Sequence, residues 1–516
     1  MTAETQASKA PSPDSLYGPF GIGVVVIAVT ALRLLYLLVS PLDLHPDEAQ
    51  YWSWSLEPDW GYFSKPPLIA WLIAAETALC GTGEACIKAG SPIAHGITAC
   101  FIYATAACLY DRRAAFFAAL LYLTLPGVSF SAAIMSTDPL LIAFWSAALY
   151  IVVRLWHGEA YSLSWWAALG AALGLGLNAK YAMGFFLAGF VLWLGLVGEA
   201  RRGLLGHRRG WLGLLIALGL GAALILPNAY WNYKNGFVTF SHTVANADIG
   251  DIVLRPRKAA EFLASQLGVF GPLGFAALLG LLIWPPAWFR DPRARLLASF
   301  TVATLLPILA VSLLSRAHAN WAATAYVAAS IWLVGTLMGP TAGAFGRLLV
   351  KFSILLHVAA AVAVFGGTIG QAAPGVYWGK PVPARFEPFK YYTGWRALGE
   401  RISELEAEHP GLPLLGHDRM LVAAALYYVT PQPVIILAWH PIARVGGHFR
   451  LKRPWKGPVG ADALVLNWRG DPAPVLARFA SSAPVATFAV PVATGENRTV
   501  RVFHARGFLG YKRAQP

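Results

Sequence analysis

The sequence predicts a polytopic α-helical membrane protein with a small α/β domain at its C-terminal end, and three observations carry this prediction. Of the 516 residues, 57% are hydrophobic and 13% are charged, with a mean hydropathy of +0.54. Average globular domains carry about 25% charged residues, so a soluble chain of this length would lack a polar surface. Apolar runs of bilayer length recur up to about residue 370, and beyond it short polar and apolar runs alternate.

The apolar runs predict eleven spans, because a helix needs about 20 mostly apolar residues to cross a bilayer. The polar residues 1–19 lack the features of a cleavable signal peptide, so we expect the first span to be retained. The run Pro67–Cys80 is too short to cross and predicts a helix in the membrane interface. The expected spans lie near residues 21–40, 88–110, 114–130, 137–155, 162–178, 182–199, 210–228, 260–283, 296–314, 319–338 and 345–367.

Arginine pairs set the expected orientation, since cytoplasmic loops are enriched in Lys and Arg. With the N-terminus inside, the pairs at 112–113, 201–202 and 208–209 all fall in cytoplasmic loops. The outer face then receives residues 42–66 and the whole tail. We therefore expect a cytoplasmic segment at 1–19, a transmembrane domain at 20–370 and a soluble outer domain at 371–516.

The tail is predicted to hold helices and strands and is strongly basic. It contains 18 Lys and Arg against 9 Asp and Glu. This charge fits either contact with lipid phosphates or an ordinary solvated basic surface. Helix-like segments are Trp395–Glu408 and Leu421–Val429, and strand-like segments are Val434–Leu437, Ala463–Leu466 and Thr499–Phe503.

The four cysteines all precede residue 110. Cys80 and Cys86 flank a glycine-rich turn on the expected outer face, where a disulfide and two free thiols remain equally open. No His or further Cys has the spacing of a tetrahedral metal site, which argues against zinc binding by these cysteines.

A dense polar segment follows the first span and contains the adjacent carboxylates Asp47 and Glu48. An acidic residue at membrane depth costs roughly 2.5–3.5 kcal/mol on insertion scales. An acidic outer loop with an aromatic belt is one explanation. The other is a catalytic cavity, because Asp138 opens a later span on the same face and Lys180 ends another. Further polar or aromatic residues on this face are Tyr62, Lys65, Tyr181, Asn228, Trp231, Asn232, His242, Arg255, Arg316, His318, Asn320 and Trp321.

Carboxylates beside Lys and Arg, lined by aromatic rings, suit transfer of a phosphorylated sugar, which needs a base and positive charge for the departing phosphate. The motifs PDEAQYW, YFSKPPLIAWL, STDPLL, GLGLNAKY and a late NW resemble the polyprenyl-phosphate-dependent glycosyltransferases of the C superfamily. Within it they resemble glycosyltransferase family 39 and the bacterial aminoarabinose transferases of lipid A. The resemblance covers about residues 20–370 in order and extends more loosely into the tail. It implies the GT-C fold, with about 11 to 13 transmembrane helices, interfacial helices in the first outer loop and a periplasmic α/β domain.

The resemblance also implies roles for single residues. Asp47 matches the residue that acts as base or orients the acceptor, Glu48 is its companion, and Asp138 matches the second acidic position. The implied contacts of the donor phosphate are Lys65, Lys180, Tyr181 and Arg316. The implied acceptor or sugar pocket is formed by Tyr62, His242, Asn320 and Trp321.

Two departures from the family pattern affect the expected metal dependence and the expected donor sugar. Ser64 stands where aminoarabinose transferases commonly have Glu, which removes a metal ligand, and Gln50 stands where they tend to have Arg. No cofactor is therefore certain. A divalent cation remains open, with Asp47, Glu48 and His242 as its candidate ligands.

The implied activity is inverting transfer of a sugar from a polyprenyl monophosphate to a glycolipid or glycan acceptor at the outer face of a bacterial inner membrane. Among enzymes of the same fold, the alternative is a protein O-mannosyltransferase. Two alternatives from other functional classes are a secondary transporter and a non-catalytic envelope assembly factor. A transporter would carry its charges near the bilayer midplane in repeated halves, a pattern that this chain lacks. We expect membrane lipids as partners, no nucleic acid, and a monomer.

Overall fold

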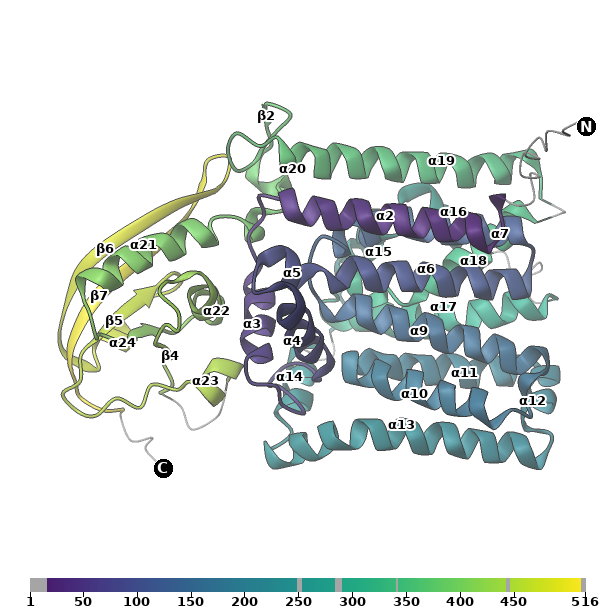
Figure 1. Ribbon diagram of the computed structural model, residues 1–516, viewed down its shortest axis with the longest axis horizontal. Coiled ribbons are helices and arrows are strands. Elements are labelled where there is room, and N and C mark those ends of the chain that lie inside the picture. Colours follow the sequence, from purple (N-terminus) through teal and green to yellow (C-terminus); the bar gives the residue numbers. More distant parts are fainter. Residues whose placement is uncertain (1–15, 248–252, 284–289, 340–341, 442–445, 512–516) are drawn as a thin grey trace, which may run out of the picture.

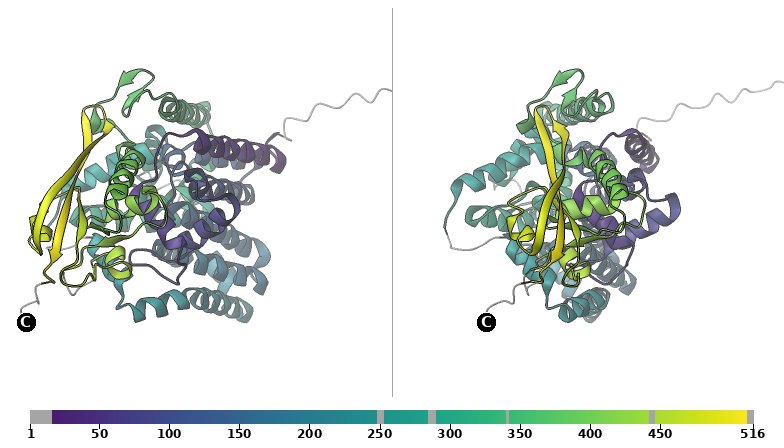
Figure 2. Two further views of the ribbon diagram at one scale, coloured as in Figure 1. Left: turned by 60° about the vertical axis from the view of Figure 1, so that its left-hand side comes forward. Right: turned by 90° about the vertical axis from the view of Figure 1, so that its left-hand side faces the viewer.

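The chain folds into a bundle of long helices with a sheet domain across one end (Figure 1). The computed structural model describes residues 16–247, 253–283, 290–339, 342–441 and 446–511. Two further views show the sheet domain at the same end (Figure 2). The bundle helices are α2 (Pro19–Val39), α6 (Gly90–Leu109), α7 (Arg112–Thr124), α9 (Thr137–Arg154), α10 (Leu163–Ala179), α11 (Gly184–Leu196), α13 (Arg208–Lys234), α15 (Pro256–Val269), α16 (Pro272–Ile283), α17 (Pro292–Leu314), α18 (Ala325–Met338) and α19 (Ala344–Ala361).

The helices fit a multi-pass membrane protein. Six helical segments among the described residues are long and apolar enough to cross a bilayer, and a seventh arises if Tyr181–Leu196 and Gly198–Leu205 (α12), which meet at 107°, count as one span. The helices α7, α10, α16 and α18 are shorter. Each expected span carries a helix, but the exact number of crossings stays a prediction.

One expected span is wrong in detail, because residues 260–283 form parts of two helices. Helix α15 ends at Val269 and α16 begins at Pro272. Gly271 between them has a φ of +84°, and a Cβ atom there would lie 1.9 Å from Nε2 of His357. The positive φ breaks the helix at this position, and glycine adopts it without strain. A residue with a side chain would also have no space here. The Gly-Pro pair marks this break in the sequence.

Short helices lie between the bundle and the sheet domain (Figure 1). Among them are α3 (Pro46–Ser55), α4 (Leu68–Cys80), α5 (Glu84–Lys88) and α14 (Val238–Ala247); α8 (Pro126–Ser131) and α20 (Gly367–Ile369) are further short helices. Helix α4 corresponds to the expected interfacial helix. A disulfide between Cys80 and Cys86 joins α4 to α5, which decides between the two thiol states left open by the sequence.

The C-terminal domain is built on a five-stranded sheet with the order β4-β3-β5-β7-β6. Strand β3 is parallel to β4 and β5, whereas β7 is antiparallel to β5 and β6. The sequence did not indicate β6, an edge strand whose two prolines are tolerated only there or at bulges. The elements are β1 (Val376–Tyr377), β2 (Lys380–Pro381), α21 (Trp395–Glu408), β3 (Leu414–Gly416), α22 (Arg419–Tyr428), β4 (Ile436–Ala438), α23 (His448–Lys452), β5 (Ala463–Asn467), α24 (Ala473–Leu476), β6 (Phe479–Ala493) and β7 (Glu496–Phe508).

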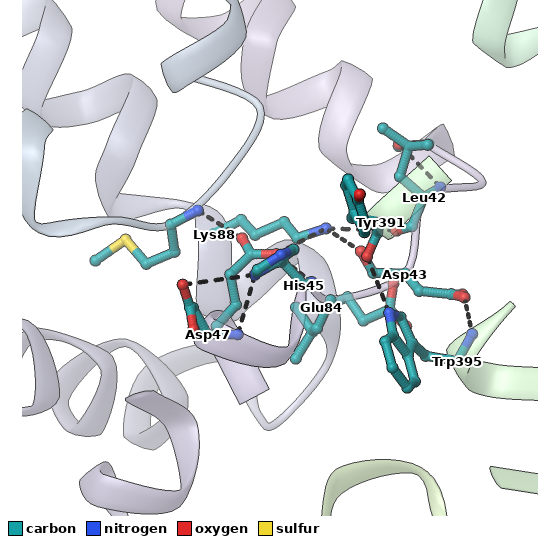
Figure 3. Close-up of polar contacts among 12 residues, drawn as sticks. Leu42, Asp43, His45, Asp47, Glu84, Lys88, Tyr391 and Trp395 are labelled. Atoms are coloured by element: carbon teal, nitrogen blue, oxygen red, sulfur yellow. Dashed lines mark hydrogen bonds and ion pairs between the residues drawn. The ribbon is translucent and has the colours of Figure 1, made fainter. Parts of the chain in front are cut away.

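A shared apolar core fixes the sheet domain on the segment that follows α2. Trp54 and Ile69 from this segment belong to the same buried cluster as Trp395 and Leu421 from the domain. Asp43 adds a polar contact, since its Oδ2 accepts a hydrogen bond of 2.7 Å from the backbone N–H of Trp395 at the start of α21 (Figure 3). Burial of aromatic side chains dominates such interfaces. The N-terminus of α22 is thereby held against α3.

Candidate active site

Helix α3 carries the first acidic motif, and two reciprocal hydrogen bonds cap its N-terminus. The backbone N–H of Asp47 donates to Nδ1 of His45 over 3.1 Å, and the N–H of His45 donates to Oε2 of Glu48 over 2.7 Å (Figure 3). This reciprocal pattern is a capping box, and Pro46 at the first helical position strengthens it. The cap fixes the direction in which the Asp47 side chain leaves the helix.

The structure gives Glu48 a positioning role, which differs from the catalytic role implied by its motif. Its Oε1 accepts from the N–H of Met135 over 2.5 Å, its Oε2 is already used by His45, and Lys88 lies 3.9 Å away. The residue is 1% exposed, and burial raises its pKa. Both oxygens are occupied by the protein, so Glu48 joins α3 to the segment before α9 and does not face a substrate.

Asp138 lies in the first turn of α9 and holds three segments together. Its Oδ1 accepts from Nζ of Lys180 over 2.6 Å, and its Oδ2 accepts from Nδ2 of Asn320 over 2.7 Å. The hydroxyl of Ser136 caps the helix N-terminus at Asp138. Three residues predicted from separate motifs thus meet, and Asn320 contacts the carboxylate of Asp138.

Asp47 pairs with an arginine that the sequence did not single out. Nη1 of Arg419, at the start of α22, lies 2.6 Å from Oδ1 of Asp47 and 3.0 Å from Oε1 of Gln50. Burial opposes ionisation of Asp47, but the charges of Arg419 and His45 outweigh it and hold the pKa of Asp47 below its usual range. Asp47 is therefore ionised and ion-paired in the ligand-free protein.

Lys65 is a cation of the site whose side chain has no partner among the described residues. Its ammonium group makes no hydrogen bond and no ion pair there, although its backbone carbonyl oxygen accepts from the N–H of Tyr62, and the residue is half-buried in the loop between α3 and α4. Burial and the nearby charge of Lys180 lower its pKa to about 8, against the opposing charges of Asp138 and Asp47. An incoming anion would find this ammonium group uncompensated.

Asp47 and Asp138 line the same cavity, which has a volume of about 880 Å³. His45, His318 and Asn320 lie on its wall with them, and apolar residues of the bundle form much of the rest. A volume of this size accommodates a drug-sized ligand or a segment of a lipid. The apolar wall comes from Leu125, Val128, Phe130, Ile134, Ile142, Val269, Ala323, Ala361, Val364 and Phe365.

The other predicted residues divide into two groups. The hydroxyl of Tyr181 donates to Asn228 over 2.7 Å and accepts from Asn232 over 3.1 Å, which ties it to α13. Tyr62 is 1% exposed, stacks on Trp54 at 4.4 Å and donates its hydroxyl to the Trp54 carbonyl oxygen. These contacts give both tyrosines a packing role, in contrast to their expected roles at phosphate and sugar.

The second group, Arg316, Trp321 and His242, is not part of the cavity lining. Arg316 is exposed. The pKa of His318 is lowered, first by burial of its ring and second by the charge of Arg316. Trp321 packs its ring on His318 at 5.3 Å. His242 contacts Phe63 at 5.2 Å, and burial with the charge of Lys65 lowers its pKa.

The candidate metal ligands are not assembled. No three His, Cys, Asp or Glu side chains converge on one point within the described ranges. Glu48 uses both oxygens on backbone N–H groups, and Asp47 is held by Arg419. The Asp47, Glu48 and His242 set therefore does not fit a divalent cation in this arrangement.

Sequence comparisons find relatives among membrane glycosyltransferases. The family described as dolichyl-phosphate-mannose-protein mannosyltransferase matches residues 64–231. The lipid A galacturonosyltransferase RgtD of Rhizobium johnstonii is 33% identical over 315 residues, which are 61% of this chain and 65% of that protein. An undecaprenyl phosphate-alpha-4-amino-4-deoxy-L-arabinose arabinosyl transferase of Pseudomonas fluorescens is 31% identical over 221 residues, which are 39% of this chain and 35% of that protein. The chain thus aligns with less than two thirds of the length of each relative.

Structural comparison extends over almost the whole chain. ArnT from Cupriavidus metallidurans in the apo state matches with a TM-score of 0.61 and 17% identity, covering 94% of this chain and 98% of that one. The structure of the same protein bound to undecaprenyl phosphate matches with a TM-score of 0.60 and 18% identity, over the same shares of both chains. At this identity the likeness establishes the fold.

Proposed function

We propose that the chain is a GT-C glycosyltransferase that transfers a sugar from a polyprenyl (undecaprenyl) monophosphate to lipid A, lipopolysaccharide or another envelope glycan. The matching family model, the relatives and the shared fold support this. The active site and the C-terminal domain face the periplasm, and the protein resides in the bacterial inner membrane. The name of the Rhizobium relative supports a lipid A acceptor, and the name of the Pseudomonas relative supports an undecaprenyl-phosphate donor.

The observation that carries the proposal is the charge arrangement around the large cavity. Asp47 is paired with Arg419, and Asp138 is paired with Lys180. Lys65 has no counter-ion within 4 Å among the described residues, so its ammonium group is open to an incoming anion. A donor phosphate supplies that anion, and the apolar wall of the cavity suits a lipid chain.

The reaction follows from these positions. The acceptor hydroxyl attacks the anomeric carbon as the bond from that carbon to the phosphate oxygen breaks, and its proton passes to Asp47. Lys65 and Lys180 stabilise the departing polyprenyl phosphate, which leaves as an anion without protonation. Attack opposite to the leaving group inverts the configuration of the sugar.

Reconstitution tests the proposal. The purified protein would be incubated with undecaprenyl phosphate carrying galacturonic acid, 4-amino-4-deoxyarabinose or mannose, and with lipid A or a Ser/Thr-rich peptide as acceptor. We expect release of undecaprenyl phosphate and a mass increase of lipid A for one donor. Glycosylated peptide would instead favour the mannosyltransferase alternative, which the matching family description suggests. Movement of labelled donor across sealed vesicles with no release of undecaprenyl phosphate would overturn the proposal in favour of a transporter.

A further inference from the structure

A second cavity lies in the C-terminal domain, next to the active site. It measures about 100 Å³ and opens at the carboxyl ends of β3 and β4, where α22 begins. Arg419 lines this small cavity, and Asp47 lines the large one. The ion pair between them therefore joins the two cavities. In open α/β sheets, ligands bind in the crevice outside the carboxyl ends of parallel strands.

The small cavity has the charge of an anion site. Arg419 and Arg450 line it together with the carboxylate of Asp418. That carboxylate is already used, since its Oδ1 accepts from the backbone N–H groups of Met420 and Leu421 over 2.8 and 3.1 Å. Arg450 has no ion pair among the described residues. The remaining charge of the lining is therefore positive.

A buried histidine supplies a second, independent observation. His448 also lines the small cavity, is 6% exposed, and its Nδ1 has no hydrogen-bond partner among the described residues. Its ring centroid lies 5.2 Å from that of Trp54 in α3. Buried polar atoms normally have partners, so this ring nitrogen is available to bind a polar group that enters the cavity.

We propose that Arg419, with His448, binds a phosphate of the acceptor glycolipid, and that this phosphate takes Arg419 from Asp47. The inference rests on the proposed function and extends it to the acceptor. Asp47 must contact the acceptor hydroxyl, and Arg419 contacts Asp47, so an anion held by Arg419 lies on the acceptor side. Lys65 and Lys180 serve the donor phosphate on the side of Asp138.

The exchange has a chemical consequence for the base. Arg419 now keeps the pKa of Asp47 low, which makes the carboxylate a poor proton acceptor. When an acceptor phosphate takes over the guanidinium, Asp47 loses its counter-ion and becomes more basic. An acceptor that carries the phosphate therefore binds to Arg419 and, by doing so, makes Asp47 a stronger base. An acceptor without it leaves Asp47 paired.

The pair is built for exchange. The side chains of Asp47 and Arg419 are 42% and 44% exposed, and exposed ion pairs contribute little free energy. A phosphate offers two oxygens to a guanidinium in the bidentate geometry that Arg favours. Substitution by lysine keeps the charge and loses this geometry.

The test compares Arg419→Gln with the wild type on phosphorylated lipid A and on the same lipid A after phosphatase treatment. Loss of a charge-assisted contact corresponds to about a 10- to 100-fold effect. We expect the KM for phosphorylated acceptor to rise by this factor, with the donor KM within about twofold. Arg419→Lys should recover part of the loss. Lys452→Gln is the matched control, because Lys452 pairs with Asp59 across the same domain interface over 3.3 Å, and it should act as the wild type does.

Two further readouts separate binding from folding. Native mass spectrometry without donor should show phosphorylated lipid A bound to the wild type and lost from Arg419→Gln, whatever the transfer activity is. In the variant, the acid limb of the pH profile should shift upward, because Asp47 no longer has its counter-ion. Equal loss of activity on both acceptors, a rise in the donor KM alone, or unchanged acceptor binding would overturn the inference. Wild-type protein that binds this acceptor but transfers no sugar to it would overturn the proposed function alone.

Discussion

The two ion pairs at the large cavity are built differently. Asp138 and Lys180 come from helix ends within the bundle, their side chains are 10% and 18% exposed, and Asn320 adds a third contact. Asp47 and Arg419 come from two domains and are 42% and 44% exposed. Removing one partner of a buried pair is costly, whereas an exposed pair exchanges partners easily. The bundle therefore holds a fixed pair, and the domain interface holds an exchangeable one.

Asp47→Asn should produce the largest change in activity. The amide keeps the size of the carboxylate but cannot take a proton, so kcat should fall by about 100- to 10,000-fold. Because the pair is exposed, thermal stability in detergent should stay near that of the wild type. Kinetics with saturating donor and acceptor, and a melting curve, check both statements. Full activity of Asp47→Asn would remove Asp47 from the role of base.

Asp138→Ala should instead reduce stability as well as activity. It leaves the ammonium of Lys180 buried without its carboxylate, at a cost of about 3–5 kcal/mol. The double variant Asp138→Ala with Lys180→Met should recover much of the stability but not the activity. Melting temperatures of the two variants measure this. An Asp138→Ala variant as stable as Asp47→Asn would show that the two pairs do not differ in the way their burial indicates.

Lys65 should give the activity an alkaline limb. Its pKa of about 8 in the free protein means that it is charged below this pH and loses its charge above it. The donor KM should therefore be constant below pH 8 and rise about tenfold per pH unit well above it. Lys65→Arg should abolish this limb, because Arg stays charged. Lys65→Ala should raise the donor KM at every pH, and a limb that persists in it would assign the titration to another group.

The sequence predicted the carboxylates and their helices better than their partners. Asp47 and Asp138 were visible because acidic residues at membrane depth are costly and rare. Arg419 lies 372 positions from Asp47, and nothing in the sequence indicated that the two pair. In the structure Arg419 also contacts Gln50, the neighbour of Asp47 on α3. Pairing between domains depends on docking, which residue periodicity does not encode.

Local patterns also determined which parts of the fold were predictable. Helix α21 matches the expected Trp395–Glu408 because its apolar residues repeat with helical period. Strand β6 was missed because it is an edge strand with much of its length exposed, so burial imposes little alternation on it. Glu48 shows the same limit of local patterns. A carboxylate that caps a helix and one that acts on a substrate look alike in a sequence, and only its occupied oxygens separate them.

Tyr62→Phe should have the smallest effect and asks whether the loop after α3 contacts the sugar at all. In the structure the hydroxyl of Tyr62 donates to the carbonyl oxygen of Trp54 and accepts from the N–H of Asp59, so its loss should cost about 1 kcal/mol of stability. Its ring keeps the stacking on Trp54, which holds the loop in place. Both KM values and kcat should therefore stay within about twofold. A tenfold rise in either KM with unchanged stability would show that the hydroxyl contacts a substrate, and that the loop rearranges when the exchangeable pair opens.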